Sequence, residues 1–169
     1  MENRGAEKTW MRLQIESRSS NEEFARVTAA VFLSRMNPTV EEMEDVKTAV
    51  SEAVTNCVIH GYRERPGIIY IEAEIEGREF TVRVRDEGAG IADVRKAMEP
   101  MYTSDPTGER SGMGFSFMEA FMDEVKVESE PGRGTLVTMK KRIGGTAREA
   151  AQERKAGTGN EGIGGIAYG

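Results

Sequence analysis

The sequence predicts an α/β protein, an α+β two-layer sandwich in which helices cover one face of a mixed, mostly antiparallel sheet. Segments that alternate apolar and polar residues occur as two hairpin-like pairs, which is the pattern of strands with one buried face. Other segments repeat their apolar residues with the 3.6-residue period of a helix. Because such a sheet has one wet face, we expect the helices on a single side of it.

The first predicted elements are an edge strand and a helix. Residues 10–15 alternate as an edge strand would. Asn21 is expected to cap the first helix, since two glutamates follow it in the first turn. The residues that then follow helical spacing are Phe24, Val27, Val31 and Ser34. The helix is predicted to stop near Asn37-Pro38.

The second helix and the first hairpin follow. Thr39 and Glu42 have the spacing of a capping box, and Gly61 suits the residue after the helix. Residues 69–76 and 80–84 read as strands joined at Gly77-Arg78. Arg83 and Arg85 are expected to meet glutamates across this hairpin.

The second half of the chain is less regular. Residues 86–114 are rich in glycine, proline and charge, with a short helical piece near 93–98. Residues 115–122 read as a helix, and 125–130 with 135–141 as a second hairpin. Overall we expect a loose leader over 1–9, one folded domain over 10–143 and a disordered glycine-rich tail over 144–169.

Composition limits the function. The 169 residues suffice for one domain with a sizeable core. A net charge of −6 argues against direct nucleic-acid binding, which needs a basic face. Cys57 is the only cysteine, so disulfide frameworks and CxxC zinc sites are excluded. Without an apolar stretch of about 20 residues or a signal-peptide segment, we expect a cytoplasmic protein with no membrane attachment.

Three polar residues recur every fourth position on the second helix: Glu52, Asn56 and His60. Such groups are rarely buried without partners, because their desolvation is costly. An asparagine oxygen is a suitable ligand for Mg²⁺, and a glutamate one turn away could act as a general base. A carboxylate at a helix rim is the alternative for Glu52. For His60 the favoured interpretation is a cation at a helix C-terminus.

Three glycine-containing pieces could bind a ligand. In Asp86-Glu87-Gly88-Ala89-Gly90 the aspartate can accept a hydrogen bond from an exocyclic amine, and the glycines allow close approach of a flat ligand. Ser111-Gly112-Met113-Gly114 precedes a helix, where free amides suit phosphate. An ordinary loop and a flexible helix entry are the alternatives. Gly134-Thr135, at a strand start, is by composition an ordinary strand piece.

A long segment, 99–110, separates the first two glycine pieces. Its length suggests a lid, a binding loop or disorder. Arg110 at its end could reach a terminal phosphate or simply be solvated. The pieces match neither a Rossmann fingerprint nor a P-loop, since the third glycine and the GK[ST] sequence are missing.

The order of these motifs is more specific than any one of them. It resembles the Bergerat-type ATP-binding domain shared by gyrase, Hsp90, MutL and histidine kinases, the GHKL superfamily. Within it, the chain over 10–142 is similar to the anti-sigma F factors of spore-forming bacteria, a family of small serine kinases active in sporulation. The segments that carry this resemblance are SNEEFARVTAAVF, VSEAVTNCVIHGY, VRDEGAGI, ERSGMGFSFME and FMDEVKVESEPGRGT.

The resemblance implies that residues 10–143 form an ATP-binding kinase domain that uses ATP and Mg²⁺. Asn56 would bind Mg²⁺, and Asp86 would receive the adenine amino group with Thr135 nearby. Arg110 would contact the γ-phosphate and the substrate, and Glu52 would orient or deprotonate the acceptor serine. The other expected nucleotide-binding residues are Gly88, Gly90, Ser111, Gly112 and Gly114.

The family resemblance also implies partners. A homodimer, built through the N-terminal strand and first helix, would sequester sigma F and phosphorylate a serine of an anti-anti-sigma factor. Arg26 on the first helix is a candidate partner contact. His60 is not expected to be phosphorylated, because the chain has no helical phosphoacceptor domain. The alternatives are a nucleotide-dependent sequestering module without significant kinase activity and an ATP hydrolase, which this length disfavours because such enzymes carry further domains.

Overall fold

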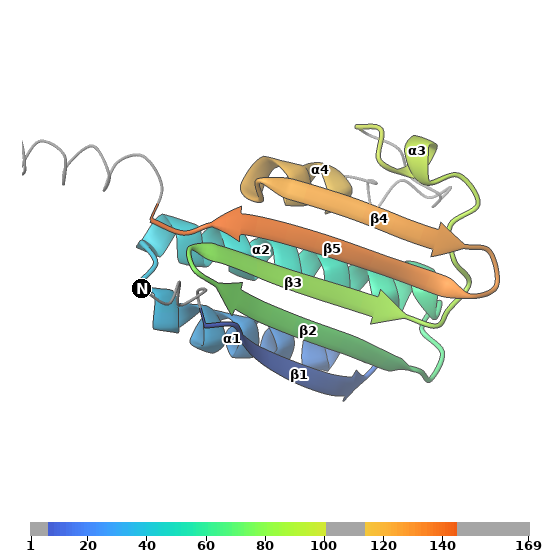
Figure 1. Cartoon of the computed structure of the whole chain (residues 1–169). Helices are drawn as coiled ribbons and strands as arrows, with labels where there is room; N and C mark the ends of the chain where they lie inside the picture. Colours follow the sequence, from blue (N-terminus) through green and yellow to red (C-terminus); the bar gives the residue numbers. More distant parts are fainter. Residues whose placement is uncertain (1–6, 101–113, 145–169) are drawn as a thin grey trace, which may run out of the picture.

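Five strands form one sheet in the order β1-β2-β3-β5-β4 in the computed structural model, which describes residues 7–100 and 114–144 (Figure 1). Within these ranges every neighbouring pair is antiparallel. Strand β5 lies between β3 and β4, so those two run in the same direction without pairing. The strands are β1 Thr9–Glu16, β2 Ile68–Glu76, β3 Glu79–Asp86, β4 Glu124–Glu130 and β5 Gly134–Arg142.

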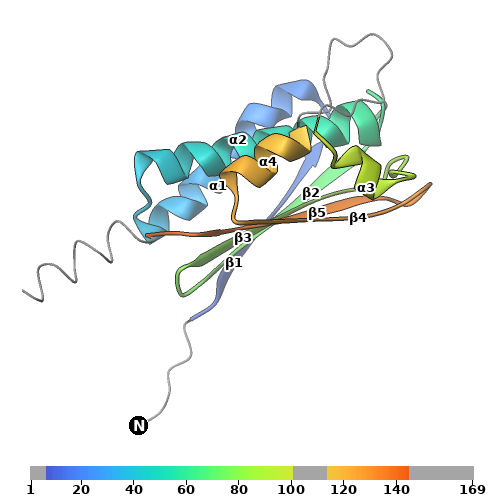
Figure 2. The same cartoon turned by 90° about the horizontal axis from the view of Figure 1, so that it is seen from above.

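The helices all lie on one face of this sheet (Figure 2), which confirms the predicted two-layer α/β architecture. Helix α1 runs along the β1 edge and helix α4 along the β4 edge, with α2 between them (Figure 1). None of the described helices is both long and apolar enough to cross a membrane. The helices are α1 Glu22–Leu33, α2 Val40–Asn56, α3 Val94–Ala97 and α4 Gly114–Phe121, with short turns η1 Ser19–Asn21, η2 Ser34–Met36 and the π-helical η3 Cys57–Gly61.

Helix α2 begins with the capping box that its sequence predicts. The backbone N–H of Glu42 donates to Thr39 Oγ1 at 3.1 Å, and the Thr39 N–H donates to Glu42 Oε2 at 2.8 Å. The other Glu42 oxygen accepts the Gly144 N–H at 2.8 Å. One carboxylate therefore caps the central helix and ties the chain end after β5 to it.

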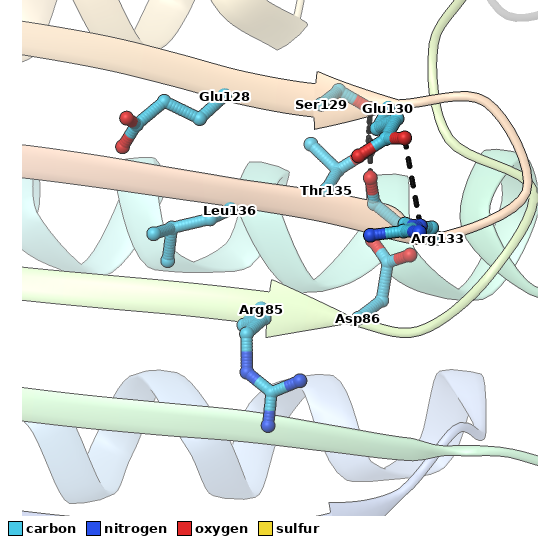
Figure 3. Close-up of a pocket in the computed structure, with 9 residues that line it drawn as sticks. Arg85, Asp86, Glu128, Ser129, Glu130, Arg133, Thr135 and Leu136 are labelled. Atoms are coloured by element: carbon cyan, nitrogen blue, oxygen red, sulfur yellow. Dashed lines mark hydrogen bonds and ion pairs between the residues drawn. The ribbon is translucent and has the colours of Figure 1, made fainter.

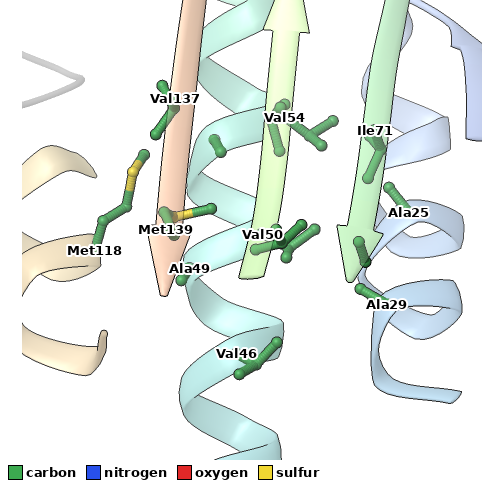
Figure 4. Packing of buried hydrophobic residues seen from close by; sticks show 14 of the residues in the cluster. Ala25, Ala29, Val46, Ala49, Val50, Val54, Ile71, Met118, Val137 and Met139 are labelled. Atoms are coloured by element: carbon green, nitrogen blue, oxygen red, sulfur yellow. The ribbon is translucent and has the colours of Figure 1, made fainter. Parts of the chain in front are cut away.

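The core lies between α2 and the middle strands. Val46, Ala49, Val50 and Val54 of α2 are fully buried and point toward the sheet (Figure 4). Burying a valine-sized side chain stabilises the folded state by about 1.5–3 kcal/mol relative to leaving it exposed. This apolar face holds α2 in place, so the polar residues on the same helix have a fixed position.

Helix α1 buries a different face from the one its large apolar residues mark. Ala25, Ala29 and Leu33 are buried, and the small alanines let the helix lie close to the sheet. The apolar side chains at the predicted spacing are exposed instead: Phe24 by 56%, Val27 by 45% and Val31 by 65%. The pattern located the helix but not its buried side.

Asn21 is the N-cap residue of helix α1, as predicted, but it does not cap the helix through its side chain. Its amide Nδ2 donates instead to the carbonyl oxygen of Glu16, at 3.0 Å. The short turn η1 places the side chain toward the end of β1, so Asn21 joins the strand to the helix.

The open face of the sheet carries cross-strand ion pairs. Arg83 lies 3.3 Å from Glu72 and 3.1 Å from Glu74, as predicted. Arg85 departs from the prediction: it pairs with Glu87 at 2.9 Å and stacks over the ring of Tyr70, with 4.0 Å from Cζ to the ring centroid. The Arg85–Glu87 pair is exposed and the two Arg83 pairs are partly exposed, so solvent weakens all three and each contributes only modestly to stability.

Candidate functional site

Glu52 and Asn56 converge on the first residue of helix α4. A Cβ built on Gly114 would lie 3.2 Å from Glu52 Oε2, 3.3 Å from Asn56 Oδ1 and 3.4 Å from Asn56 Nδ2. The two side chains therefore face one small space, which glycine leaves open. His60 falls in the π-helical turn η3, where the α-helical period no longer applies, so the predicted stripe ends at Asn56.

Glu52 lies next to a second carboxylate. Burial raises the pKa of Glu52, and the negative charge of Glu22 raises it further. Glu22 accepts a hydrogen bond from the Ser51 hydroxyl, and its carboxylate lies 3.8 Å from Nε of Arg26. A carboxylate with a raised pKa is better matched to removing a proton from a hydroxyl near neutral pH.

A small hollow of about 200 Å³ opens beside this cluster. Ser19 lines it from the turn η1 and Glu22 from the start of α1, while Thr55 lines it from α2, about one turn after Glu52. Val58 and Ile59 complete the lining. The hollow is large enough for a small side chain, and Glu22, which raises the pKa of Glu52, lines it, although Glu52 does not.

Asp86 is a buried carboxylate at the end of strand β3. Its Oδ1 accepts the Gly88 N–H at 2.9 Å. Burial raises the pKa of Asp86, although hydrogen bonds from neighbouring groups oppose the rise. The adjacent Cys57 is also buried, and burial together with the charge of Asp86 places the pKa of its thiol well above the ordinary value. The thiol therefore stays protonated.

Three glycines allow the backbone to close around Asp86. A Cβ on Gly61 would meet the Asp86 carboxylate at 2.8 Å. A Cβ on Gly88 would overlap the carbonyl of Gly61, and one on Gly134 would overlap the carbonyl of Asp86. Gly61 was expected only as a helix end. Nothing in its local pattern distinguishes that role from packing against a carboxylate.

Thr135 lies opposite Asp86 in the β3–β5 register. Its Oγ1 is 2.8 Å from Oγ of Ser129, and Figure 3 shows these side chains together at the strand ends. Gly90, with φ of +71°, packs against the Glu130 carbonyl nearby. The predicted Asp86, Gly90 and Thr135 are thus brought together, and Ser129 joins them although no sequence motif singled it out.

Tyr62 is a second residue that the motifs did not indicate. Its hydroxyl donates to the Ile68 carbonyl at 2.5 Å and accepts the Glu87 N–H at 2.8 Å. The ring also covers Gly67, where a Cβ would overlap it. Tyr62 therefore ties the backbone next to Asp86 to the start of strand β2.

A hollow of about 330 Å³ lies at the ends of strands β3, β4 and β5 (Figure 3). No described residue of α2 lines it; its lining residues are Arg85, Asp86, Glu128, Ser129, Glu130, Arg133, Gly134, Thr135 and Leu136. We place the chemistry on the helix side, because Glu52 and Asn56 lie there.

Among the described residues, no group of three or more His, Cys, Asp or Glu side chains is arranged to hold a metal ion. Mg²⁺ needs only one or two protein oxygens when phosphates and waters supply the rest. The Asn56 oxygen, facing the space that Gly114 leaves open, fits that requirement. Three predicted residues lie outside the described ranges: Arg110, Ser111 and Gly112.

Comparisons with known proteins identify the family to which the chain belongs. The model of the histidine kinase-like ATPase domain matches residues 16–141. A Clostridium acetobutylicum protein named anti-sigma F factor is 59% identical over 133 residues, covering 79% of this chain and 93% of that protein. A Thermoanaerobacter sp. protein of the same name is 56% identical over 134 residues, covering 79% and 94%.

Two solved structures share the fold. The RsbU and RsbW domains of a Mycobacterium tuberculosis protein match with a TM-score of 0.58 and 19% identity, over 80% of this chain and 32% of that one. The catalytic domain of the histidine kinase ThkA matches with a TM-score of 0.50 and 16% identity, over 80% and 96%. At these identities the likeness concerns the fold alone.

Proposed function

The chain belongs to the anti-sigma F factor family of histidine kinase-like ATPase domains, and from this we propose that it is an ATP-dependent serine kinase that also inhibits a sigma factor. Its sigma factor would be sigma F, and its substrate a serine of an anti-anti-sigma factor. The convergence of Glu52 and Asn56 on Gly114 carries the proposal, and Cys57, the residue after Asn56, links this cluster to Asp86.

In the proposed nucleotide site, Asp86 receives the amino group of adenine. Because Gly88 and Gly90 have no side chains, their loop packs against the carbonyls of Gly61 and Glu130, which would hold its backbone beside the base. Asn56 would hold Mg²⁺ against the phosphates, and the ion would supply neutralisation of their charge when bound. Gly114, with Ser111 and Gly112 before it, would contribute backbone amides to the phosphates.

In the proposed transfer step, Glu52 accepts the proton of the acceptor serine hydroxyl while that oxygen bonds to the γ-phosphorus and ADP leaves. Its raised pKa suits this role. The hollow lined by Glu22 and Thr55 provides an approach for the serine. Arg110 would contact the terminal phosphate. As in other phosphoryl transfers, positioning and charge neutralisation would contribute most of the rate.

Helix α1 supports the proposed protein contacts. The Arg26 side chain is 37% exposed and lies 3.8 Å from Glu22 and 3.7 Å from Glu23, so its outer guanidinium nitrogens can reach a partner at this surface. Phe24, Val27 and Val31 form an exposed apolar stripe on α1, the helix that runs along the edge strand β1 (Figure 1). We assign the apolar stripe, together with strand β1, to a homodimer interface, and Arg26 to the contact with the sigma factor. A sigma factor acts in the cytoplasm, which would also be the location of this protein.

The deciding experiment is incubation of the chain with γ-labelled ATP, Mg²⁺ and the anti-anti-sigma protein. We expect label on that protein, and none when its acceptor serine is replaced by alanine. Binding of sigma F is measured in parallel with ADP and ATP. If ATP and sigma F bind but no label is transferred, the protein is a nucleotide-dependent sequestering module and not a kinase.

A further inference from the structure

The hydroxyl of Ser129 occupies the centre of a hydrogen-bond cluster beside Asp86. Its oxygen lies 2.8 Å from the Gly134 carbonyl, 2.8 Å from the Ile91 backbone nitrogen and 2.8 Å from Thr135 Oγ1. The Gly132 N–H also donates to the Ala89 carbonyl, at 2.8 Å. The loop after Asp86 and the turn between β4 and β5 are therefore joined around this hydroxyl.

The direction of the bond between Ser129 and Thr135 follows from counting hydrogens. A serine hydroxyl has one hydrogen to donate and two lone pairs to accept with. The Gly134 carbonyl can only accept, so it takes the hydrogen of Ser129. The Ile91 N–H can only donate, so it uses one lone pair. Thr135 must therefore donate its own hydrogen to the second lone pair of Ser129.

Thr135 is left with lone pairs only. An ionised Asp86, its neighbour across the β3–β5 register, is also only an acceptor. The edge formed by these two side chains thus offers acceptors and no side-chain donor. An exocyclic amine, which donates, is complementary to such an edge. A carbonyl oxygen at the same place would meet lone pairs.

We propose that Ser129 is a specificity-determining residue: by fixing the Thr135 hydroxyl as an acceptor, it makes the site select a 6-aminopurine nucleotide over a 6-oxopurine nucleotide. Ser129 acts through Thr135 and is a positioning residue, without contact to the base. The inference rests on the proposed nucleotide site, whose base-binding end it describes in more detail.

The test compares ATP with ITP, which has the same sugar and triphosphate but a 6-oxo group. Affinities are measured by calorimetry for the wild type and for Ser129→Ala and Ser129→Thr. In Ser129→Ala the Thr135 hydroxyl is free to turn and donate, so we expect the preference for ATP to fall about tenfold, mainly through tighter ITP binding. Ser129→Thr keeps the hydroxyl and should keep the preference. Thr138→Val, on the same strand but on the open face, is the matched control and should change nothing.

Thr135→Val tests the same point without altering Ser129, in case Ser129→Ala does not fold. It should weaken ATP severalfold and leave ITP unchanged or tighter, because only an acceptor is lost. Equal weakening of both nucleotides would overturn the inference, as would a full ATP preference in Ser129→Ala. If the folded wild type binds neither nucleotide, the nucleotide site itself is refuted, and the role of Ser129 with it.

Discussion

Gly61 lies directly against the carboxylate of Asp86, and a Cβ on Gly61 would come within 2.8 Å of its Cγ and Oδ1. Gly61→Ala should therefore displace Asp86. We expect adenine nucleotide affinity to fall at least tenfold and the free energy of unfolding to fall by about 1–3 kcal/mol. Calorimetry with ADP and thermal unfolding measure the two effects.

Gly132→Ala is the control for that change. A Cβ at Gly132 would meet nothing within 4 Å, although φ of +79° makes any side chain there strained. It should lower stability by about 1 kcal/mol while leaving ADP affinity unchanged. If both glycine variants bind ADP as the wild type does, the close packing at Gly61 does not position Asp86 for a ligand.

Glu52 and Asn56 should separate catalysis from nucleotide binding. Glu52→Gln keeps the shape but removes the base, so we expect phosphate transfer to fall about 10²- to 10⁴-fold with ATP affinity retained. Asn56→Ala removes the proposed Mg²⁺ ligand and should abolish Mg²⁺-dependent ATP binding. The measurements are label transfer in single turnover and calorimetry with and without Mg²⁺. Transfer that survives Glu52→Gln would exclude this residue as the base.

Nucleotide binding should weaken in acid. Because burial raises the pKa of Asp86 above the ordinary value of 3.8, the carboxylate takes up a proton at a higher pH than a free aspartate. Protonation removes the negative charge and turns one acceptor oxygen into a donor, so ADP affinity should fall as pH decreases through that raised pKa, approaching tenfold per pH unit below it. Fluorescence titration between pH 4 and 8 measures this.

Asp86→Asn is the variant that isolates this titration. A raised pKa means that ionisation of Asp86 lowers the free energy of unfolding. This loss of stability is complete above the folded-state pKa and absent below the unfolded-state pKa. Asp86→Asn should therefore raise the melting temperature at neutral pH while weakening ADP binding. Its remaining affinity should be flat over the same pH range. An equally steep acid loss in this variant would assign the titration to another group.

The exposed stripe on α1 predicts a change in oligomeric state. Val31→Asp places a charge on this stripe and should raise the dimer dissociation constant by about 10- to 100-fold, as measured by sedimentation. Phe117→Asp is the matched control, since Phe117 is an exposed aromatic residue on α4 at the other edge of the sheet. If the folded Val31→Asp variant has the same dimer dissociation constant as the wild type, the interface lies elsewhere.

Arg26 should affect partners more than nucleotide. Arg26→Ala removes the guanidinium next to Glu22, and we expect sigma-factor affinity to fall about 30-fold with ADP affinity unchanged. Surface plasmon resonance with immobilised partner measures this. Arg18→Ala is the control, because Arg18 is a more exposed arginine near the same end of α1, paired with Glu16 at 3.1 Å. Equal losses from both variants would indicate a general charge effect.

Local patterns predicted most of the elements correctly. The alternation in β2 and β3 and the capping box at Thr39 depend on residues close in sequence, so their signals are complete within a short window. The buried side of α1 was not predictable in this way. Ala25 and Ala29 are weak apolar signals, and only the closeness of the helix to the sheet makes them the buried face.

The sequence by itself determined the α/β class, the order of the motifs and the residues most suited to bind a nucleotide, because each of these depends on residue type and spacing along the chain. Only the tertiary structure decided that Glu22 raises the pKa of Glu52, that Gly61 packs on Asp86 and that Ser129 hydrogen-bonds to Thr135. These relationships join separate elements. Their effects depend on distances and hydrogen-bond directions that exist only once strands and helices are packed together.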